Sequence, residues 1–208
     1  MPRRRFTGES GDVEPALVVV GASAGGLSVL QLLVAGLPAN WPMALAIVQH
    51  RSRESHALCE LLQDVSALPI IEVNDKEEIV VGHVFLAPPD YHMLAEDEHV
   101  SLSVDDPERW SRPSIDVLFE SAADALGDRV VGVVLTGANS DGSRGLRRIV
   151  DSGGQAVVQD PATAEVRVMP EAARRAVPEA CVLPMEAIPG HLANLRGRNR
   201  VPCVGGVR

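Results

Sequence analysis

The chain has 208 residues, of which 46% are hydrophobic and 23% are charged, and this describes an ordinary globular protein of one domain. A net charge of −9 and only 3% aromatic residues argue against a nucleic-acid-binding protein, which usually presents a basic face and stacking side chains. No apolar run reaches the length of about eighteen residues that a spanning helix needs, so we expect no membrane insertion.

The N-terminal stretch 1–15 is polar and rich in turn-forming residues, and we expect it to be a disordered tail. It has no apolar segment of the kind found in signal peptides. The three cysteines, Cys59, Cys181 and Cys203, form no CxxC pair, which favours a reduced, cytoplasmic protein. Neither they nor the six histidines have the spacing of a metal site, so no metal is expected.

Short apolar runs alternate with amphipathic patterns along residues 16–196. Residues 91–104 read as an antiparallel hairpin with "EDEH" as its turn, and Ser114 is the expected N-cap of the helix that follows. We expect residues 197–208 to form a C-terminal tail. In chain order, the patterns predict a strand at 16–21, a helix at 26–38, a strand at 43–50, a helix at 54–69, a strand at 83–89, the hairpin, a helix at 114–127, a strand at 129–137, a helix at 143–154, a strand at 155–160, a helix at 170–177, a strand at 181–184 and a helix at 187–196.

Continuous apolar strands alternating with amphipathic helices are typical of a parallel sheet covered on both faces. The predicted fold class is therefore α/β, with a doubly wound, mostly parallel sheet, to which the hairpin adds antiparallel strands. No internal repeat or linker interrupts residues 16–196, so this range is expected to form a single domain.

Three reactive side chains follow three separate predicted strands. Ser23 follows the first strand, His50 ends the second, and Asp141 follows the strand at 129–137. Ligands of such sheets bind beyond the carboxyl ends of the strands, so these side chains are expected at one edge of the sheet. A serine nucleophile needs an imidazole to take its proton and a carboxylate to orient that imidazole, which makes the three a candidate catalytic set.

The serine lies in "GASAG", residues 21–25, which has the G-x-S-x-G spacing of a nucleophile elbow. Such a turn lifts the serine out, and the N–H groups of the following helix suit an oxyanion. Taken one by one, the residues have simpler roles. Ser23 is also suited to helix capping or phosphate contact, His50 to a structural role, and Asp141 to a turn. His191 is a rival base, because a conventional α/β-hydrolase places its histidine late in the chain.

Several segments together resemble the catalytic domain of the chemotaxis receptor methylesterases, the CheB-type protein-glutamate methylesterase family. They are "VVVGASAGG", "IVQH", "VFLAPPDYHM", "RPSIDVLFES", "VVGVVLTGANSDGSRGL" and "QDPATAEVRVMPEAA", in the family's order over roughly residues 16–196. The resemblance implies a triad of Ser23, His50 and Asp141, and no cofactor. It also implies hydrolysis of γ-glutamyl methyl esters on the cytoplasmic helices of methylated chemoreceptors, with glutamine deamidation as a second activity.

The chain departs from the family pattern near the expected oxyanion site. Ala24 stands where members often have threonine, and Ala138 stands where they often have methionine. The oxyanion donors implied by the resemblance are backbone N–H groups near Ala24, Gly25 and Ala138. Only about fifteen residues precede the first predicted strand, where the best-known members carry a receiver domain. Regulation is therefore expected from a separate partner such as a response regulator, from a domain outside the given sequence, or from expression.

Three other functions stay open on the sequence alone. The substitutions at Ala24 and Ala138 are compatible with a catalytically weak signalling or binding module of the same fold. A general α/β carboxylesterase would use His191 in place of His50. A nucleotide-binding domain is the least supported, because the glycine spacing is neither GxGxxG nor GxxxxGK[ST].

Overall fold

The computed structural model describes residues 17–51 and 57–195, so the expected tails at 1–15 and 197–208 lie outside the described residues. The elements are β1 (Leu17–Ala22), α1 (Gly26–Ala35), β2 (Ala44–Gln49), α2 (Leu58–Gln63), β3 (Ile70–Glu72), β4 (Glu77–Glu78), β5 (Val84–Leu86), β6 (His92–Ala95), β7 (His99–Ser103), α3 (Ile115–Leu126), β8 (Val130–Val134), α4 (Ser143–Asp151), β9 (Gln155–Gln159), α5 (Val168–Ala176), β10 (Cys181–Leu183) and α6 (Ile188–Ala193). Short 3-10 helices occupy 127–129, 161–163 and 185–187.

The central sheet has seven strands in the order β10-β9-β8-β1-β2-β5-β3, and every pair is parallel. From β1 the chain adds β2, then the edge strand β3, and then β5 between those two, before it continues on the other side of β1 with β8. The strand order therefore reverses between β1 and β8, the place where doubly wound sheets bind their ligands.

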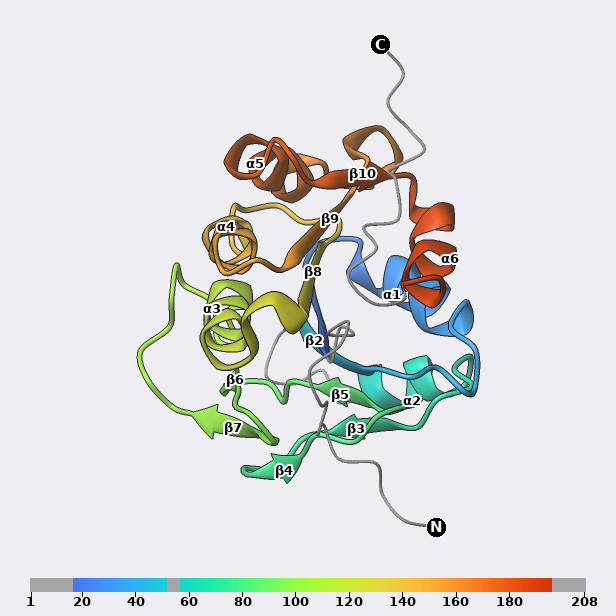
Figure 1. The fold of residues 1–208 in the computed structure, drawn as a ribbon, viewed down its shortest axis with the longest axis vertical. Coiled ribbons are helices and arrows are strands. Elements are labelled where there is room, and N and C mark those ends of the chain that lie inside the picture. Colours follow the sequence, from blue (N-terminus) through green and yellow to red (C-terminus); the bar gives the residue numbers. More distant parts are fainter. Residues whose placement is uncertain (1–16, 52–56, 196–208) are drawn as a thin grey trace.

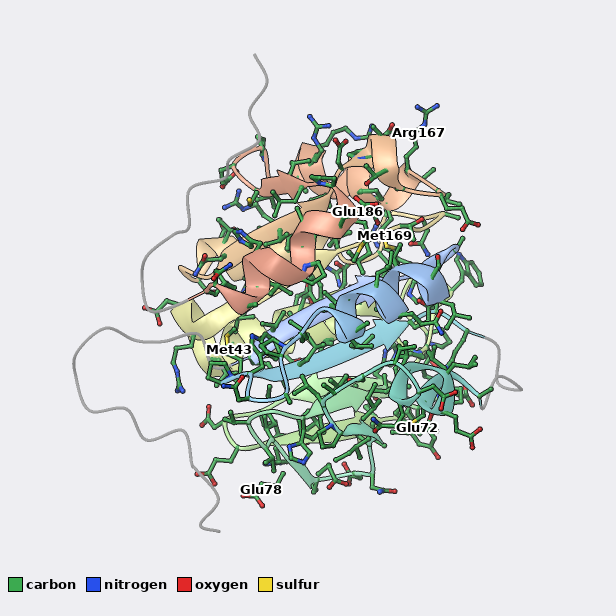
Figure 2. All side chains as sticks on the ribbon, turned by 90° about the vertical axis from the view of Figure 1, so that its right-hand side faces the viewer. Met43, Glu72, Glu78, Arg167, Met169 and Glu186 are labelled. Atoms are coloured by element: carbon green, nitrogen blue, oxygen red, sulfur yellow. The ribbon has the colours of Figure 1, made fainter. Side chains whose placement is uncertain are left out.

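Two helical layers cover the sheet (Figure 1). α1, α2 and α6 pack on one face, and α3, α4 and α5 pack on the other. The strands are buried on both faces, which explains why β1 and β2 read as continuous apolar runs. α1 shows how a helix fits this layer: its buried residues Val29, Leu30, Leu33 and Val34 repeat with helical spacing on one side. Figure 2 shows α1 and α6 lying across the strands on this side.

The mostly parallel sheet, the two helical layers and the hairpin agree with the predicted fold class. One detail differs: the hairpin of β6 and β7 does not join the central sheet. It pairs with the two-residue strand β4 in a separate antiparallel sheet of order β4-β7-β6. The reason is that Met93, Ala95 and Val100 of the hairpin pack into the core against α3, so the hairpin covers that layer from outside.

The cysteines also differ from the sequence expectation. Cys59 is a free thiol, as expected, but Cys181 is disulfide-bonded. Cys181 is nearly buried on the edge strand β10. The prediction that all three thiols are reduced is therefore wrong, because no spacing between the cysteines indicates this bond. No helix within residues 17–51 and 57–195 has the length and apolar character that crossing a membrane requires.

Candidate active site

Ser23 and His50 occupy equivalent positions at the ends of two adjacent strands. In the parallel pair β1–β2, Ala22 lies opposite Gln49, so the next residue of each strand is one of the two candidates. The His50 N–H continues this pairing by donating to the Ala22 carbonyl at 3.1 Å. The local fold therefore delivers the serine and the histidine together, as the parallel-sheet argument predicts.

Gln49 ties the two candidates together through its side chain. Its Nε2 donates to the Ser23 carbonyl at 2.8 Å and to the His50 carbonyl at 3.0 Å. One amide group thus holds the backbone of both residues. Sequence reasoning missed this residue, although a polar side chain at the end of the apolar run "MALAIVQH" marks it as unusual.

Thr136 holds the serine turn from the opposite side. Its carbonyl accepts a hydrogen bond from the Ser23 N–H at 3.0 Å, and its Oγ1 donates to the Ala24 carbonyl at 2.9 Å. The side chain is fully buried just after β8. Thr136 was also missed, because its role depends on a contact between segments more than a hundred residues apart.

The position of Ser23 between β1 and α1 depends on two glycines, one before it and one after it. Gly25 has a φ of 73°, in the left-handed region that favours glycine, and it directly precedes α1. A Cβ on Gly21 would lie 2.3 Å from the Ile115 side chain, so only glycine allows the start of α3 to approach the end of β1 this closely. That approach brings α3 to the site.

His50 and Asp141 are joined by a hydrogen bond of 2.8 Å between Nε2 and Oδ2. If Nε2 carries the proton that it shares with the carboxylate, the lone pair lies on Nδ1, which becomes the basic nitrogen. The residues that the structure describes contain no hydrogen bond between the Ser23 hydroxyl and His50. The structure therefore places the three predicted residues on adjacent strand ends and hydrogen-bonds two of them.

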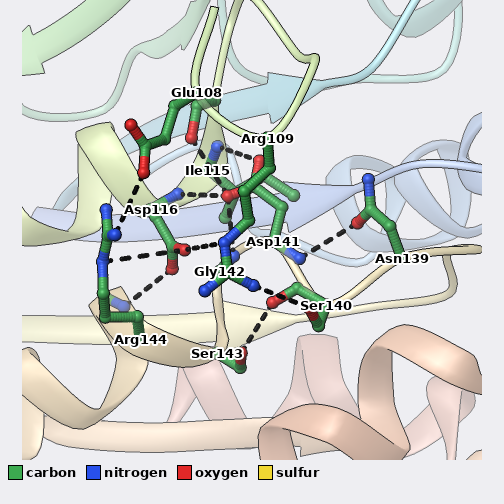
Figure 3. A network of polar contacts seen from close by, with 12 residues as sticks. Glu108, Arg109, Ile115, Asp116, Asn139, Ser140, Asp141, Gly142, Ser143 and Arg144 are labelled. Atoms are coloured by element: carbon green, nitrogen blue, oxygen red, sulfur yellow. Dashed lines mark hydrogen bonds and ion pairs between the residues drawn. The ribbon is translucent and has the colours of Figure 1, made fainter.

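Asp141 is completely buried and accepts five hydrogen bonds. Figure 3 shows it among Ile115, Asp116 and Gly142. Burial by itself raises the pKa of this carboxyl group, but the hydrogen bonds from His50 and from the backbone at the start of α3 outweigh it and lower the pKa. Asp141 is thus held in its charged form. Besides His50, its donors are the N–H groups of Ile115 (2.7 Å), Asp116 (2.9 Å) and Gly142 (3.0 Å) and the hydroxyl of Ser114 (3.0 Å).

A second buried carboxylate, Asp116, lies in the same network. Its Oδ1 accepts from the Gly145 N–H at 2.8 Å, while its Oδ2 faces Arg109 at 3.8 Å and Arg144 at 4.0 Å. Burial, and to a lesser degree the charge of Asp141, raise the pKa of Asp116 to about 6. Asp141 therefore binds the start of α3, and Asp116, from α3, binds the first turn of α4.

Of the predicted oxyanion donors, Ala24 and Gly25 lie in the serine turn, and Ala138 follows Thr136, which binds that turn. Within the described ranges, the N–H groups of Ala24, Gly25 and Ala138 donate no hydrogen bond to the protein. Unpaired backbone donors at the start of a helix suit an anionic oxygen.

Ser114, the expected N-cap of α3, accepts from the Val117 N–H at 3.5 Å, so this prediction is confirmed.

His191, the rival base, lies on α6 and is placed elsewhere. Its neighbour Pro189 packs against Gly36, at the carboxyl end of α1, whereas Ser23 precedes the amino end of the same helix. A helix of this length spans about 15 Å. The structure thus separates His191 from Ser23.

Arg51, Arg53 and Arg112 are candidate cations for steering an acidic substrate, and the two of them that the structure describes are engaged in the fold. Arg51 pairs with Glu72 at 2.5 Å, and Arg112 pairs with Asp90 at 2.7 Å, while Arg53 lies outside the described residues. The described part of the chain contains no group of three histidine, cysteine or acidic side chains arranged to hold a metal ion.

The sequence matches the family described as CheB methylesterase over residues 18–192. A relative from Leptospira interrogans, provisionally named protein-glutamate methylesterase/protein-glutamine glutaminase, is 44% identical and aligns with 82% of this chain and 90% of its own length. Protein-glutamate methylesterase/protein-glutamine glutaminase 4 of Geobacter metallireducens is 35% identical over 86% of this chain, which spans about half (52%) of that relative.

Among solved structures, the CheB methylesterase catalytic domain of Thermotoga maritima superposes with a TM-score of 0.83 and 32% identity. The match covers 88% of this chain and all of that domain. The fold class predicted from the sequence is confirmed by this agreement. The family predicted from the sequence motifs is confirmed as well, and the chain belongs to the CheB methylesterase family.

Proposed function

We propose that this methylesterase hydrolyses γ-glutamyl methyl esters on methylated chemoreceptors through a covalent acyl-serine intermediate. The observation that carries the proposal is the buried, charged Asp141, hydrogen-bonded to His50 at the strand end beside Ser23. The relatives named protein-glutamate methylesterases support the choice of substrate.

In the first step, Ser23 Oγ attacks the γ-carbonyl carbon of the ester and passes its proton to His50 Nδ1. Asp141 stabilises the imidazolium that forms, because its carboxylate stays charged. The backbone N–H groups near Ala24, Gly25 and Ala138 receive the negative charge that develops on the carbonyl oxygen. His50 then protonates the leaving methoxide, which departs as methanol.

In the second step, water attacks the acyl-serine. His50 takes a proton from this water and returns one to Ser23, and the glutamate carboxylate is released. A glutamine side chain would enter the same sequence with ammonia as the leaving group. We include this deamidation in the proposal because the relatives are also named protein-glutamine glutaminases.

The decisive experiment is methanol release from a methylated chemoreceptor cytoplasmic domain. Ser23→Ala is expected to abolish release, because the proposed acyl intermediate forms on the Ser23 hydroxyl. Ser28→Ala is the matched control, since Ser28 is an exposed serine five positions further along the same turn and helix. Equal loss in both variants, or release that survives Ser23→Ala, would contradict the proposal.

A fluorophosphonate that labels activated serines separates the enzyme from a catalytically weak binding module. Stoichiometric labelling of the wild type, absent in Ser23→Ala, is expected. A wild type that is folded but unlabelled would instead favour the binding module suggested by Ala24 and Ala138.

A further inference from the structure

Trp110 is the most exposed large apolar side chain in the described part of the chain, with 99% of its surface open to solvent. The other tryptophan, Trp41, is 2% exposed in the core. A fully exposed indole contributes nothing to the packing of its own domain. Tryptophan is, however, one of the residue types in which the energetic hot spots of protein–protein contacts are enriched.

The backbone around Trp110 is held in an unfavourable conformation. The Ser111 N–H donates to the Glu108 carbonyl at 2.9 Å, which closes a tight turn. The two central residues, Arg109 and Trp110, have φ values of 49° and 68°. Turns with two left-handed central residues normally use Asn-Gly, because bulky side chains are strained there. Strain of this kind persists where the surroundings enforce it, and it often marks a functional segment.

Ion pairs and hydrogen bonds enforce the turn from both sides. Arg144 binds Glu108 at 3.0 Å, and Arg109 donates to the Ser140 hydroxyl at 2.7 Å. Arg112 ties the end of the turn to Asp90. Every charged neighbour of Trp110 in the turn is thus anchored, while the indole itself points away from the protein.

The turn is also connected to the candidate active site. Ser140, which Arg109 binds, directly precedes Asp141, and Arg109 lies 3.8 Å from Asp116 (Figure 3). The anchored turn therefore lies beside the loop that carries Asp141, so a large substrate that covers this loop also meets Trp110.

We propose that Trp110 docks into an apolar hollow on the methylated substrate protein, next to the glutamyl ester that enters the site. This inference rests on the proposed function, because only a protein substrate extends beyond the site to reach the rim. The reacting group, a single methyl ester, offers few contacts, and contacts remote from it are used to position such a group.

The size of the contact fits an enzyme that must release its product. An inserted tryptophan buries about 150–250 Å² of its own surface. A stable complex usually buries about 1,200–2,000 Å² in total. Trp110 is therefore an anchor for a transient complex, and it selects a folded partner over a small ester.

The test compares a protein substrate with a small one. Trp110→Ala is expected to lower kcat/KM for methanol release from a methylated receptor fragment at least tenfold, and to leave kcat/KM for 4-nitrophenyl acetate unchanged. Leu32→Ala is the matched control, because Leu32 is an exposed apolar side chain (51%) on the outer side of α1. Trp110→Ala losing both activities equally, or neither, would overturn the inference.

A second measurement does not require turnover. In the Ser23→Ala variant, acrylamide quenches the exposed Trp110 and spares the buried Trp41. Adding the methylated fragment is expected to reduce this quenching, and Ser23→Ala/Trp110→Phe is expected to show no such change. Protection without methanol release from the wild type would support docking and overturn the proposed function. Methanol release with unprotected Trp110 would overturn docking alone.

Discussion

His50 and Asp141 are hydrogen-bonded at 2.8 Å although they follow strands that are not neighbours. β2 and β8 lie on opposite sides of β1, and Ser23 follows β1 itself. The histidine and the aspartate therefore meet across the end of the strand that supplies the serine. This arrangement uses the reversal point of the strand order, and it requires the loop after β8 to reach over β1.

Asp141→Asn is expected to impair both stability and activity. The substitution removes the charge and converts an acceptor into a donor, although all five partners of Asp141 donate hydrogen bonds. We expect the free energy of unfolding to fall by about 3 kcal/mol, because buried donors that bonded to the charged carboxylate lose their acceptor. Urea denaturation measures it. Asp97→Asn, at an exposed hairpin turn, is the control and should change neither property.

Asp116→Asn is expected to change how stability depends on pH. The pKa of Asp116 is raised from 3.8 to about 6 in the folded protein, so the folded state binds this proton more tightly than the unfolded state. The stabilisation of the folded state by this tighter proton binding to Asp116 is complete below pH 4 and is lost as the pH rises through 6. The groups facing the carboxylate are Arg109, Arg144 and Asp141.

The Asn variant should therefore gain stability relative to the wild type between pH 4 and pH 7, by on the order of 2 kcal/mol. Urea titrations at four pH values would show the change. Asp141 acts in the opposite direction and in a different window, because its pKa is lowered and its stabilisation is lost only as the pH falls below 4. A constant difference between the two proteins from pH 4 to pH 7 would refute the assignment.

Glu165→Gln is expected to accelerate formation of the acyl-enzyme. A Cβ on Gly25 would lie 2.8 Å from Glu165 Oε2, so this exposed carboxylate sits against the serine turn. Its negative charge opposes the oxyanion that forms there. Stopped-flow acylation with 4-nitrophenyl acetate should become a few-fold faster at low salt and should approach the wild-type rate at about 1 M salt, where the Debye length is about 3 Å. Glu98→Gln, in the hairpin turn, should have no effect.

His50→Ala is expected to reduce ester hydrolysis by at least about a hundredfold, as loss of a general base does. His191→Ala should leave the rate unchanged, because His191 is located beyond the far end of α1 from Ser23. Steady-state hydrolysis of the same small ester tests both. The opposite pattern would restore the carboxylesterase that uses His191.

The sequence was sufficient to predict that Ser23, His50 and Asp141 approach one another. Parallel strands align their carboxyl ends, so locating three strands also locates the residues after them. The helix α3 and its N-cap Ser114 could also be predicted from the sequence, because capping is a local interaction.

Other features depend on long-range contacts that leave no local pattern. Gln49 and Thr136 act through single hydrogen bonds to the serine turn. β3 and β4 are only three and two residues long, too short for a periodicity to be seen. The separate sheet of the hairpin and the strained turn at Trp110 likewise follow from packing and ion pairs between distant segments.

Asp141 both binds His50 and holds the start of α3, and this has a consequence for comparing sequences. Because this carboxylate also holds the start of α3, a descendant that had abandoned catalysis would still be under selection to keep it. The Ser23 hydroxyl and the His50 ring make fewer contacts that stabilise the fold, so both residues could be substituted once catalysis is lost. An aspartate at this position therefore indicates only that a related sequence has the same fold. Retention of the serine and the histidine is what distinguishes a working esterase from an inactive descendant.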